Sequence, residues 1–304
     1  MIDPAIRQLL DSYFTAPEES GAPDIAKLRA AAVDAPRLFG GAPPALADVR
    51  DATVAGPAGP VPIRIYRPSG EGPLPLVLYA HGGGWVAGSL DSHDTLCRVL
   101  ANRLSAILVA VDYRLAPEHV YPAALDDVEA VWRWVRREAR TLGSDAQRHA
   151  VAGDSSGGNL VAALTLRLSA RGEPQPARQL LLYPALDAGS AAASYREFAS
   201  GYNLTGAQMR WFWDVYRAGA PTNDPQLAPL AARDLTGLAP AVVAVAEADV
   251  LRDEGAAYAG RLAAAGVPTE LIRCTGMIHG FLRWTGAVPA ARAWIDTIAA
   301  AVRL

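Results

Sequence analysis

The sequence predicts an α/β fold in which helices flank a mostly parallel, eight-stranded sheet and further helices form a cap. Three observations support this prediction. Short apolar runs typical of buried strands alternate with longer segments of helical pattern. Hydrophobic residues make up 51% of the 304 residues, enough for a sheet buried on both faces. The motifs that could carry chemistry follow predicted strands, so they should meet at one edge of the sheet. We expect a single domain over residues 1–304.

The strands and helices follow in chain order from this alternation. An edge strand is expected at residues 61–66, where apolar and polar residues alternate, and it should pair with residues 49–54. The other strands are expected at residues 74–80, 106–111, 150–152, 180–183, 241–245 and 269–273. Helices are expected at residues 95–104, 123–139, 159–171, 254–265 and 287–302. The alternation implies right-handed crossovers between parallel strands.

Two segments fall outside this alternation and are predicted to form the cap. Residues 1–45 are polar and rich in proline and alanine, with helix-like stretches at residues 5–14 and 24–32. Residues 188–225 contain a stripe of aromatic side chains at helical spacing. Such a stripe belongs to a core more often than to a binding site, but this one follows the active end of a strand. We therefore expect it to line an acyl pocket, with Trp85, Met209, Phe212 and Trp213 as candidate substrate contacts.

The run Gly153-Asp154-Ser155-Ser156-Gly157 is the most informative motif of the chain. It has the pattern Gly-x-Ser-x-Gly and lies between a predicted strand and a predicted helix. A sharp turn of this kind holds a serine hydroxyl exposed beside a base, and the flanking glycines let the turn close. Ser155 is therefore the predicted nucleophile. Asp154 could orient the turn and is a further candidate for substrate contact.

The partners that such a serine needs are present in a suitable order. His81-Gly82-Gly83-Gly84-Trp85 follows the strand at 74–80, and backbone N–H groups in a glycine-rich loop can bind a developing oxyanion. Asp249 follows the strand at 241–245, and His279 follows the strand at 269–273. We predict Ser155, Asp249 and His279 as a catalytic triad, with Glu247 as the alternative acid.

At these motifs the chain resembles the bacterial hormone-sensitive-lipase-like (family IV) carboxylesterases of the α/β-hydrolase superfamily. The resemblance implies an α/β-hydrolase fold with a cap, an oxyanion hole formed by the N–H groups of Gly83, Gly84 and Ser156, and no cofactor. Ser156 stands where the family usually has alanine, and Val250 where it usually has proline. The missing proline is expected to loosen the turn that carries Asp249. The motifs that carry the resemblance are residues 81–85, 112–119, 153–159, 249–255 and 279–281.

Charge and composition exclude several classes of partner. The formal net charge is −3 and no basic stripe is present, so nucleic acid and anionic membranes are not expected partners. No apolar run is long enough for a membrane span, and we expect a cytoplasmic protein. The five histidines show no metal-ligand spacing, so no metal is expected. Cys97 and Cys274 could form one disulfide but are expected to be buried free thiols.

Three functions compete at this stage. We predict a serine carboxylesterase that acts on small esters with short to medium acyl chains. An amidase or peptidase could use the same triad, and a small-molecule receptor could share the fold. The receptor is disfavoured because it would be expected to lose a member of the triad, and Ser155, Asp249 and His279 are all present. The protein is expected to be a monomer, or a homodimer if the strand at 269–273 lies at an edge of the sheet.

Overall fold

The computed structural model describes residues 1–13 and 23–304 of the chain. The strands in these residues are β1 (Asp48–Gly56), β2 (Gly59–Arg67), β3 (Leu74–Ala80), β4 (Ile107–Val111), β5 (Ser144–Asp154), β6 (Arg178–Leu182), β7 (Ala241–Ala248) and β8 (Thr269–Ile278). They form an eight-stranded sheet in the order β1-β2-β4-β3-β5-β6-β7-β8. β2 runs antiparallel to β1 and β4, and the remaining neighbours pair in parallel. The predicted fold class is confirmed.

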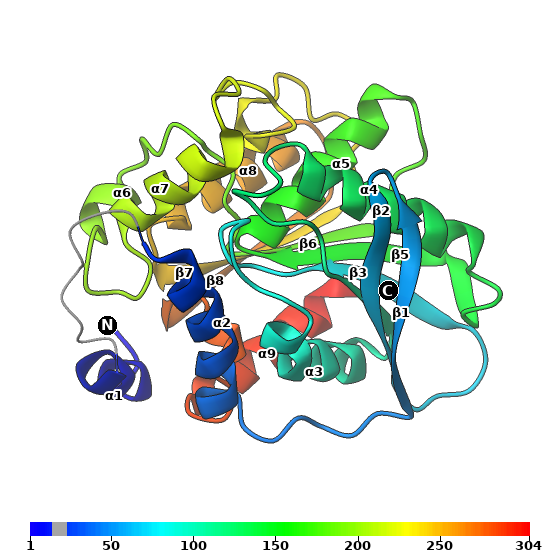
Figure 1. Cartoon of the computed structure of the whole chain (residues 1–304), viewed down its shortest axis with the longest axis horizontal. Helices are drawn as coiled ribbons and strands as arrows, with labels where there is room; N and C mark the ends of the chain where they lie inside the picture. Colours follow the sequence, from blue (N-terminus) through cyan, green and yellow to red (C-terminus); the bar gives the residue numbers. More distant parts are fainter. Residues whose placement is uncertain (14–22) are drawn as a thin grey trace.

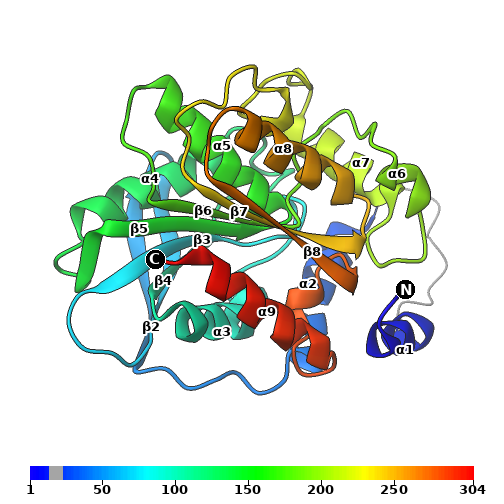
Figure 2. The ribbon, with the colours of Figure 1, turned by 180° about the vertical axis from the view of Figure 1, so that it is seen from behind.

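Helices cover both faces of this sheet. α4, α5 and α8 lie on one face, and α3 and α9 on the other (Figures 1 and 2). Every residue of β3 and β4 is buried as a result, which explains why these strands are continuous apolar runs. The bounds of these helices are α3 (Asp94–Leu104), α4 (Ala123–Arg137), α5 (Ser156–Ala170), α8 (Arg252–Ala264) and α9 (Pro289–Val302). The short 3₁₀ helices in the described residues are η1 (Asp91–His93), η2 (Pro229–Ala231) and η3 (Phe281–Arg283).

The two predicted cap segments contain helices in the structure. They are α1 (Pro4–Tyr13), α2 (Ile25–Phe39), α6 (Ser194–Glu197) and α7 (Gly206–Arg217). α2, α6 and α7 lie at the same end of the sheet (Figures 1 and 2). The cap segment 1–45 and the helix expected at residues 5–14 include Phe14, which, like the other residues from 14 to 22, lies outside the described residues.

The expectation for α2 was correct at its start and too short at its end. Asp24 caps the helix, and its side chain accepts from the backbone N–H groups of Ala26 and Lys27. The helix then continues past the predicted end at Ala32 and through Pro36 to Phe39. The reason is tertiary, because Phe39 is buried and its carbonyl accepts from the N–H groups of residues 286 and 287 at 2.8 and 3.0 Å.

The two cysteines, the last strand and the helix lengths bear on the expectations from composition. Cys97 and Cys274 are both free and buried, as predicted. β8 lies at an edge of the sheet. No helix in the described ranges, 1–13 and 23–304, is long and apolar enough to cross a bilayer.

A buried carboxyl on α8 makes stability depend on pH. Glu254 accepts from the backbone N–H groups of Leu186 and Asp187 at 2.6 and 3.3 Å, and burial raises the pKa of its carboxyl well above the ordinary value of 4.5. The folded state therefore holds this proton more tightly than the unfolded chain does. The stability that the protonated form contributes is present below about pH 4.5 and is lost as pH rises toward the folded-state pKa.

Glu254→Gln should remove this dependence, since an amide keeps the acceptor oxygen and does not titrate near neutral pH. We expect the melting temperature of the variant, relative to wild type, to be higher at pH 8 than at pH 5. Thermal unfolding at both pH values measures this difference, with the exposed Glu270→Gln as the matched control. If the melting temperatures of the variant and wild type differ by the same amount at pH 5 and at pH 8, folding does not raise the pKa of Glu254.

Candidate active site

Ser155 occupies the sharp turn between β5 and α5. Its backbone φ of 56° and ψ of −119° lie outside the regions that non-glycine residues usually adopt. The flanking glycines leave no room for a side chain. A Cβ on Gly157 would overlap the Ala80 carbonyl, and a Cβ on Gly153 would overlap the backbone of Gly157. α5 begins at Ser156, directly after the nucleophile, rather than at Asn159 as predicted. The turn therefore presents Ser155 at the N-terminus of a helix, as the motif indicates.

The structure brings the three predicted catalytic residues together. His279 Nε2 lies 2.9 Å from Ser155 Oγ, and His279 Nδ1 lies 2.7 Å from Asp249 Oδ2. Asp249 directly follows β7, and His279 directly follows β8. All three side chains are buried, and Asp249 is only 1% exposed. This geometry allows a proton to pass from serine to imidazole while a carboxylate orients the ring.

The competing acid, Glu247, has other partners. It accepts from the backbone N–H of Gly276 at 2.6 Å, and its side chain is 41% exposed. The turn after Asp249 is held without the usual proline, because the carbonyl of buried Val250 accepts from Ser194 Oγ at 2.6 Å. Asp249 Oδ1 also accepts from the N–H of Leu251 at 2.9 Å. The geometry therefore favours Asp249 over Glu247 as the partner of the histidine.

The glycine-rich loop after β3 lies against the nucleophile. Gly83 and Gly84 border the same cavity as Ser155, with φ values of 127° and 63°. These positive values favour glycine, and a Cβ on Gly84 would also overlap the ring of Phe212. Ser156 lies at the start of α5, where N–H groups have no partner within the helix and the helix dipole favours an anion. These three positions can supply the predicted oxyanion-binding N–H groups.

Asp154 supports the glycine-rich loop through hydrogen bonds of its carboxylate. Its carboxylate accepts from the Gly82 N–H at 2.8 Å and from the Tyr79 hydroxyl at 2.7 Å. His93 Nε2 lies 3.3 Å from the same carboxylate, which is only 3% exposed. Burial opposes ionisation, but attraction to His93 and these hydrogen bonds outweigh it and lower the pKa of Asp154. Asp154 also borders the cavity at Ser155, so its contact with substrate stays a prediction.

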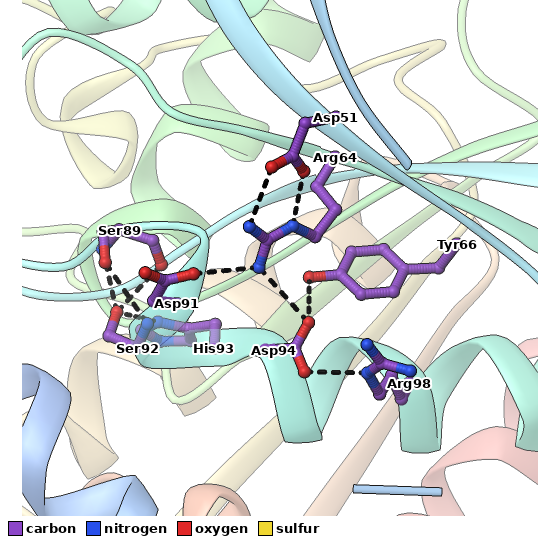
Figure 3. A network of polar contacts seen from close by, with 9 residues as sticks. All are labelled: Asp51, Arg64, Tyr66, Ser89, Asp91, Ser92, His93, Asp94 and Arg98. Atoms are coloured by element: carbon purple, nitrogen blue, oxygen red, sulfur yellow. Dashed lines mark hydrogen bonds and ion pairs between the residues drawn. The ribbon is translucent and has the colours of Figure 1, made fainter. Parts of the chain in front are cut away.

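A polar network holds His93 in place (Figure 3). Arg64 on β2 contacts Asp51 at 2.6 Å, Asp91 at 3.0 Å and Asp94 at 3.3 Å. These contacts tie the edge strands to η1 and the start of α3. His93 is the last residue of η1, and Ser92 Oγ lies 2.8 Å from its Nδ1. The network thus links the edge of the sheet to Asp154, whose carboxylate supports the glycine-rich loop. This loop, residues 81–85, is called the oxyanion loop below.

His81 braces the same loop from its other side. Its Nδ1 lies 2.8 Å from the Gly82 carbonyl, and its ring stacks on Tyr113 at 4.3 Å. The Tyr113 hydroxyl donates to the His81 carbonyl at 2.7 Å. Burial, together with the nearby His93, lowers the pKa of His81 to about 3, so this ring is neutral near pH 7 and can donate from Nδ1.

The cavity at Ser155 has a volume of about 210 Å³ and is lined mainly by apolar side chains. Met209 and Phe212 of α7 border it, as predicted. The contribution of α2 was not predicted, because alanines carry no sequence signal for a binding site. Several polar residues at the cavity wall were not predicted either. The lining residues that were not predicted are Leu28, Ala31, Ala32 and Ala35 of α2, together with Ala87, Asn203, Gln208, Gly280, Arg283 and Trp284.

Trp85 and Trp213 do not line the cavity, and both predicted contacts are corrected. Trp85 is fully buried, has a positive φ of 58° and stacks on Tyr216 at 4.4 Å with an interplanar angle of 3°. Its ring also lies 4.4 Å from that of Trp213. The loop turns sharply after Gly84, so Trp85 packs against the side of α7 that faces the interior. The two indoles therefore attach α7 to the oxyanion loop.

Comparisons with known proteins show the family of this chain. A family model for the α/β hydrolase fold matches residues 77–283. The carboxylic ester hydrolase LipN of Mycobacterium tuberculosis is 45% identical over 242 residues, which cover 77% of this chain and 64% of LipN. The carboxylesterase NlhH of the same species is 39% identical over 298 residues, which cover 95% of this chain and 92% of NlhH.

Solved structures show the same relationship. An ester-hydrolase from the metagenome of Lake Arreo is 42% identical, with a TM-score of 0.92 over 99% of this chain and 98% of that one. That structure contains a derivative of bipyridine phosphonate. The fold, the arrangement of Ser155, Asp249 and His279, and these similarities place the chain in the hormone-sensitive-lipase-like group of the α/β-hydrolase family.

Proposed function

We propose that this protein is a serine carboxylesterase in which Ser155, His279 and Asp249 cleave small esters. The observation that carries the proposal is the continuous contact from Ser155 Oγ to His279 Nε2, at 2.9 Å, and from His279 Nδ1 to Asp249, at 2.7 Å. Ser155 and His279 border an apolar cavity, and the oxyanion loop borders the same cavity. A nucleophile, a base, an oriented acid and a site for an acyl group are therefore adjacent.

In the first half of the reaction, Ser155 Oγ attacks the carbonyl carbon of the ester while its proton passes to His279 Nε2. The carbonyl oxygen becomes an oxyanion, which the N–H groups of Gly83, Gly84 and Ser156 stabilise. One such donor typically lowers the barrier by about 3 kcal/mol. When the tetrahedral intermediate collapses, the alcohol leaves with the proton from His279 and an acyl-serine ester remains.

Water completes the cycle by the same route. His279 takes a proton from the water as it attacks the acyl-serine carbonyl, and then returns a proton to Ser155 Oγ. Asp249 keeps the proton on Nδ1, so Nε2 is free to act as the base. The acid product and the free enzyme result.

We further propose that α2 and α7 form the cap, with cap segments at residues 1–45 and 188–225, and that it sets the acyl-chain length. Both helices contribute side chains to the cavity wall. A volume of about 210 Å³ is below the roughly 300–1,000 Å³ of sites for drug-sized ligands, which favours short to medium chains. The buried free thiols fit the predicted cytoplasmic location. We also propose that the protein is a monomer or a homodimer, since β8 lies at an edge of the sheet.

Hydrolysis of p-nitrophenyl esters from C2 to C16 tests this proposal. We expect kcat/KM to peak at short or medium acyl chains, because side chains of α2 form part of the cavity wall and limit the space for the chain. A p-nitroanilide of the preferred acyl group serves as the test for an amidase. Faster turnover of the anilide than of the matching ester would favour the amidase over the esterase.

Ala32→Leu should shift this profile toward shorter chains. The substitution adds three carbon atoms to the cavity wall, and each buried methylene of substrate is worth about 0.8 kcal/mol. We expect kcat/KM for the C8 ester, relative to the C2 ester, to fall at least about tenfold. Ala30→Leu is the matched control, since residue 30 is exposed on the same helix and does not line the cavity. A profile that is unchanged in Ala32→Leu would place the acyl chain elsewhere.

A further inference from the structure

One charged side chain at the cavity wall has no role in the mechanism above. Among the lining residues, Asp154, His279 and Arg283 are titratable. Asp154 is bonded to the oxyanion loop, and His279 is bonded to the other two triad members. The side chain of Arg283 has no hydrogen bond or ion pair with any of the residues that the structure describes, and its Nε is buried without a partner.

The position of Arg283 follows from the catalytic loop. It is the last residue of η3, which begins two residues after His279. The guanidinium lies against Gly280, where an added Cβ would be 3.3 Å from Arg283 Nη2 and 3.8 Å from Asn203 Nδ2. Asn203 itself donates to the His279 carbonyl at 3.2 Å. The charge of Arg283 helps to lower the pKa of both Asp154 and His81, as expected if it lies close to the reaction centre.

Two other arginines that are largely withdrawn from solvent in the described residues are paired with carboxylates. Arg167, 6% exposed, contacts Asp126 at 2.6 Å and Glu129 at 2.9 Å. Arg114 contacts Asp127 at 2.8 Å. Removing a guanidinium from water without a partner costs free energy, which explains this pairing. An arginine that is left unpaired at the wall of an apolar cavity therefore indicates a negative group on the ligand.

We propose that Arg283 binds a carboxylate on the ester substrate, so that half-esters of short dicarboxylic acids are among the preferred substrates. The inference rests on the proposed esterase function and specifies its substrate class. A planar guanidinium can bind a carboxylate through two parallel hydrogen bonds. A phosphate dianion fits less well, because no second arginine or lysine lines the cavity in the part of the chain that the structure describes. The amide of Asn203, which lies near Arg283 at Gly280, is a further polar group that borders the cavity.

A pair of isosteric esters tests the proposal. Ethyl hydrogen succinate and ethyl 4-oxopentanoate differ only in whether a carboxylate or a methyl ketone ends the acyl chain. We expect the ratio of kcat/KM for the charged ester to that for the neutral one to fall at least about tenfold in Arg283→Met, because a charge-assisted hydrogen bond is lost. The ratio should stay unchanged in Arg210→Met, which removes an exposed arginine from α7. Half-esters of malonate and glutarate then measure the preferred spacing.

A second measurement uses the wild-type enzyme alone. N-ethylsuccinamate and its neutral methyl ketone analogue should compete with p-nitrophenyl acetate, and the anion should have an inhibition constant at least about tenfold lower. This preference should weaken as salt is added. Equal inhibition by the two compounds, or a parallel loss of both ester activities in Arg283→Met, would show that Arg283 does not bind a substrate carboxylate. If wild type hydrolyses none of the esters, p-nitrophenyl acetate included, the proposed function fails and the inference fails with it.

Discussion

Replacing Ser155 with alanine should reduce kcat for a p-nitrophenyl ester by about 10⁵-fold or more, as in other enzymes that lose the nucleophile of a triad. The cause is the loss of the covalent route, because no acyl-enzyme can form without Oγ. A residual rate about 10³–10⁴-fold above that in water is expected from the oxyanion loop and the binding cavity alone. Steady-state hydrolysis of the preferred short-chain ester measures the change.

The same α5 helix provides the control for this variant. Ser169→Ala removes an exposed hydroxyl near the far end of the helix and should leave kcat unchanged. Circular dichroism and melting temperature show whether both variants are folded. More than about 1% of wild-type kcat in a folded Ser155→Ala would mean that another group attacks the ester.

Replacing Asp249 with asparagine should reduce kcat by about 10⁴-fold. Asp249 Oδ2 lies 2.7 Å from His279 Nδ1 and keeps the proton on that nitrogen. An amide that donates to Nδ1 would leave the proton on Nε2, and the imidazole could no longer accept the proton of Ser155. The carboxylate also stabilises the imidazolium that forms during the reaction, and the amide does not.

Glu247→Gln is the matched control, since both acids lie at the end of β7 and only Asp249 contacts the histidine. The amide keeps an oxygen that can accept from the Gly276 N–H, so kcat should change less than about threefold. A nearly silent Asp249→Asn together with an inactive Glu247→Gln would identify Glu247 as the catalytic acid.

The catalytic residues could be predicted from the sequence because each depends on a local pattern. Ser155 lies between small residues in a strand-to-helix turn, and the conformation of that turn is set within a few residues. Asp249 follows an apolar run typical of a buried strand, and His279 follows a segment whose first residues, 269–273, were predicted as a strand. Parallel strands direct their carboxyl ends to one edge, so strand ends that are far apart in the sequence must meet there.

Element lengths were less predictable because they depend on contacts with distant segments. β5 begins at Ser144, not at residue 150, because the start of β3 pairs with it there. β8 continues past Arg273 to Ile278, where it still pairs with β7. α2 extends to Phe39 because residues 286 and 287 bond to its end. None of these partners is adjacent in the sequence.

The lining of the cavity illustrates the same limit at the level of side chains. Met209, Phe212, Trp213 and Tyr216 are all buried on α7, and their spacing alone places them on one broad face. Phe212 reaches the cavity, whereas Trp213 packs on Trp85. The direction of Trp85 depends on the positive φ values of the glycine-rich loop, which no periodic pattern encodes.

The sequence by itself predicted the order of strands and helices along the chain, the proposed nucleophile and base, and the glycine-rich loop, because hydrophobic periodicity and turn chemistry are local properties. Only the tertiary structure decided that Asp154 supports the loop, that alanines of α2 close the cavity and that Arg283 stands unpaired at its wall. These features arise where segments distant in sequence pack together. The packing depends on the shapes and charges of all of them at once.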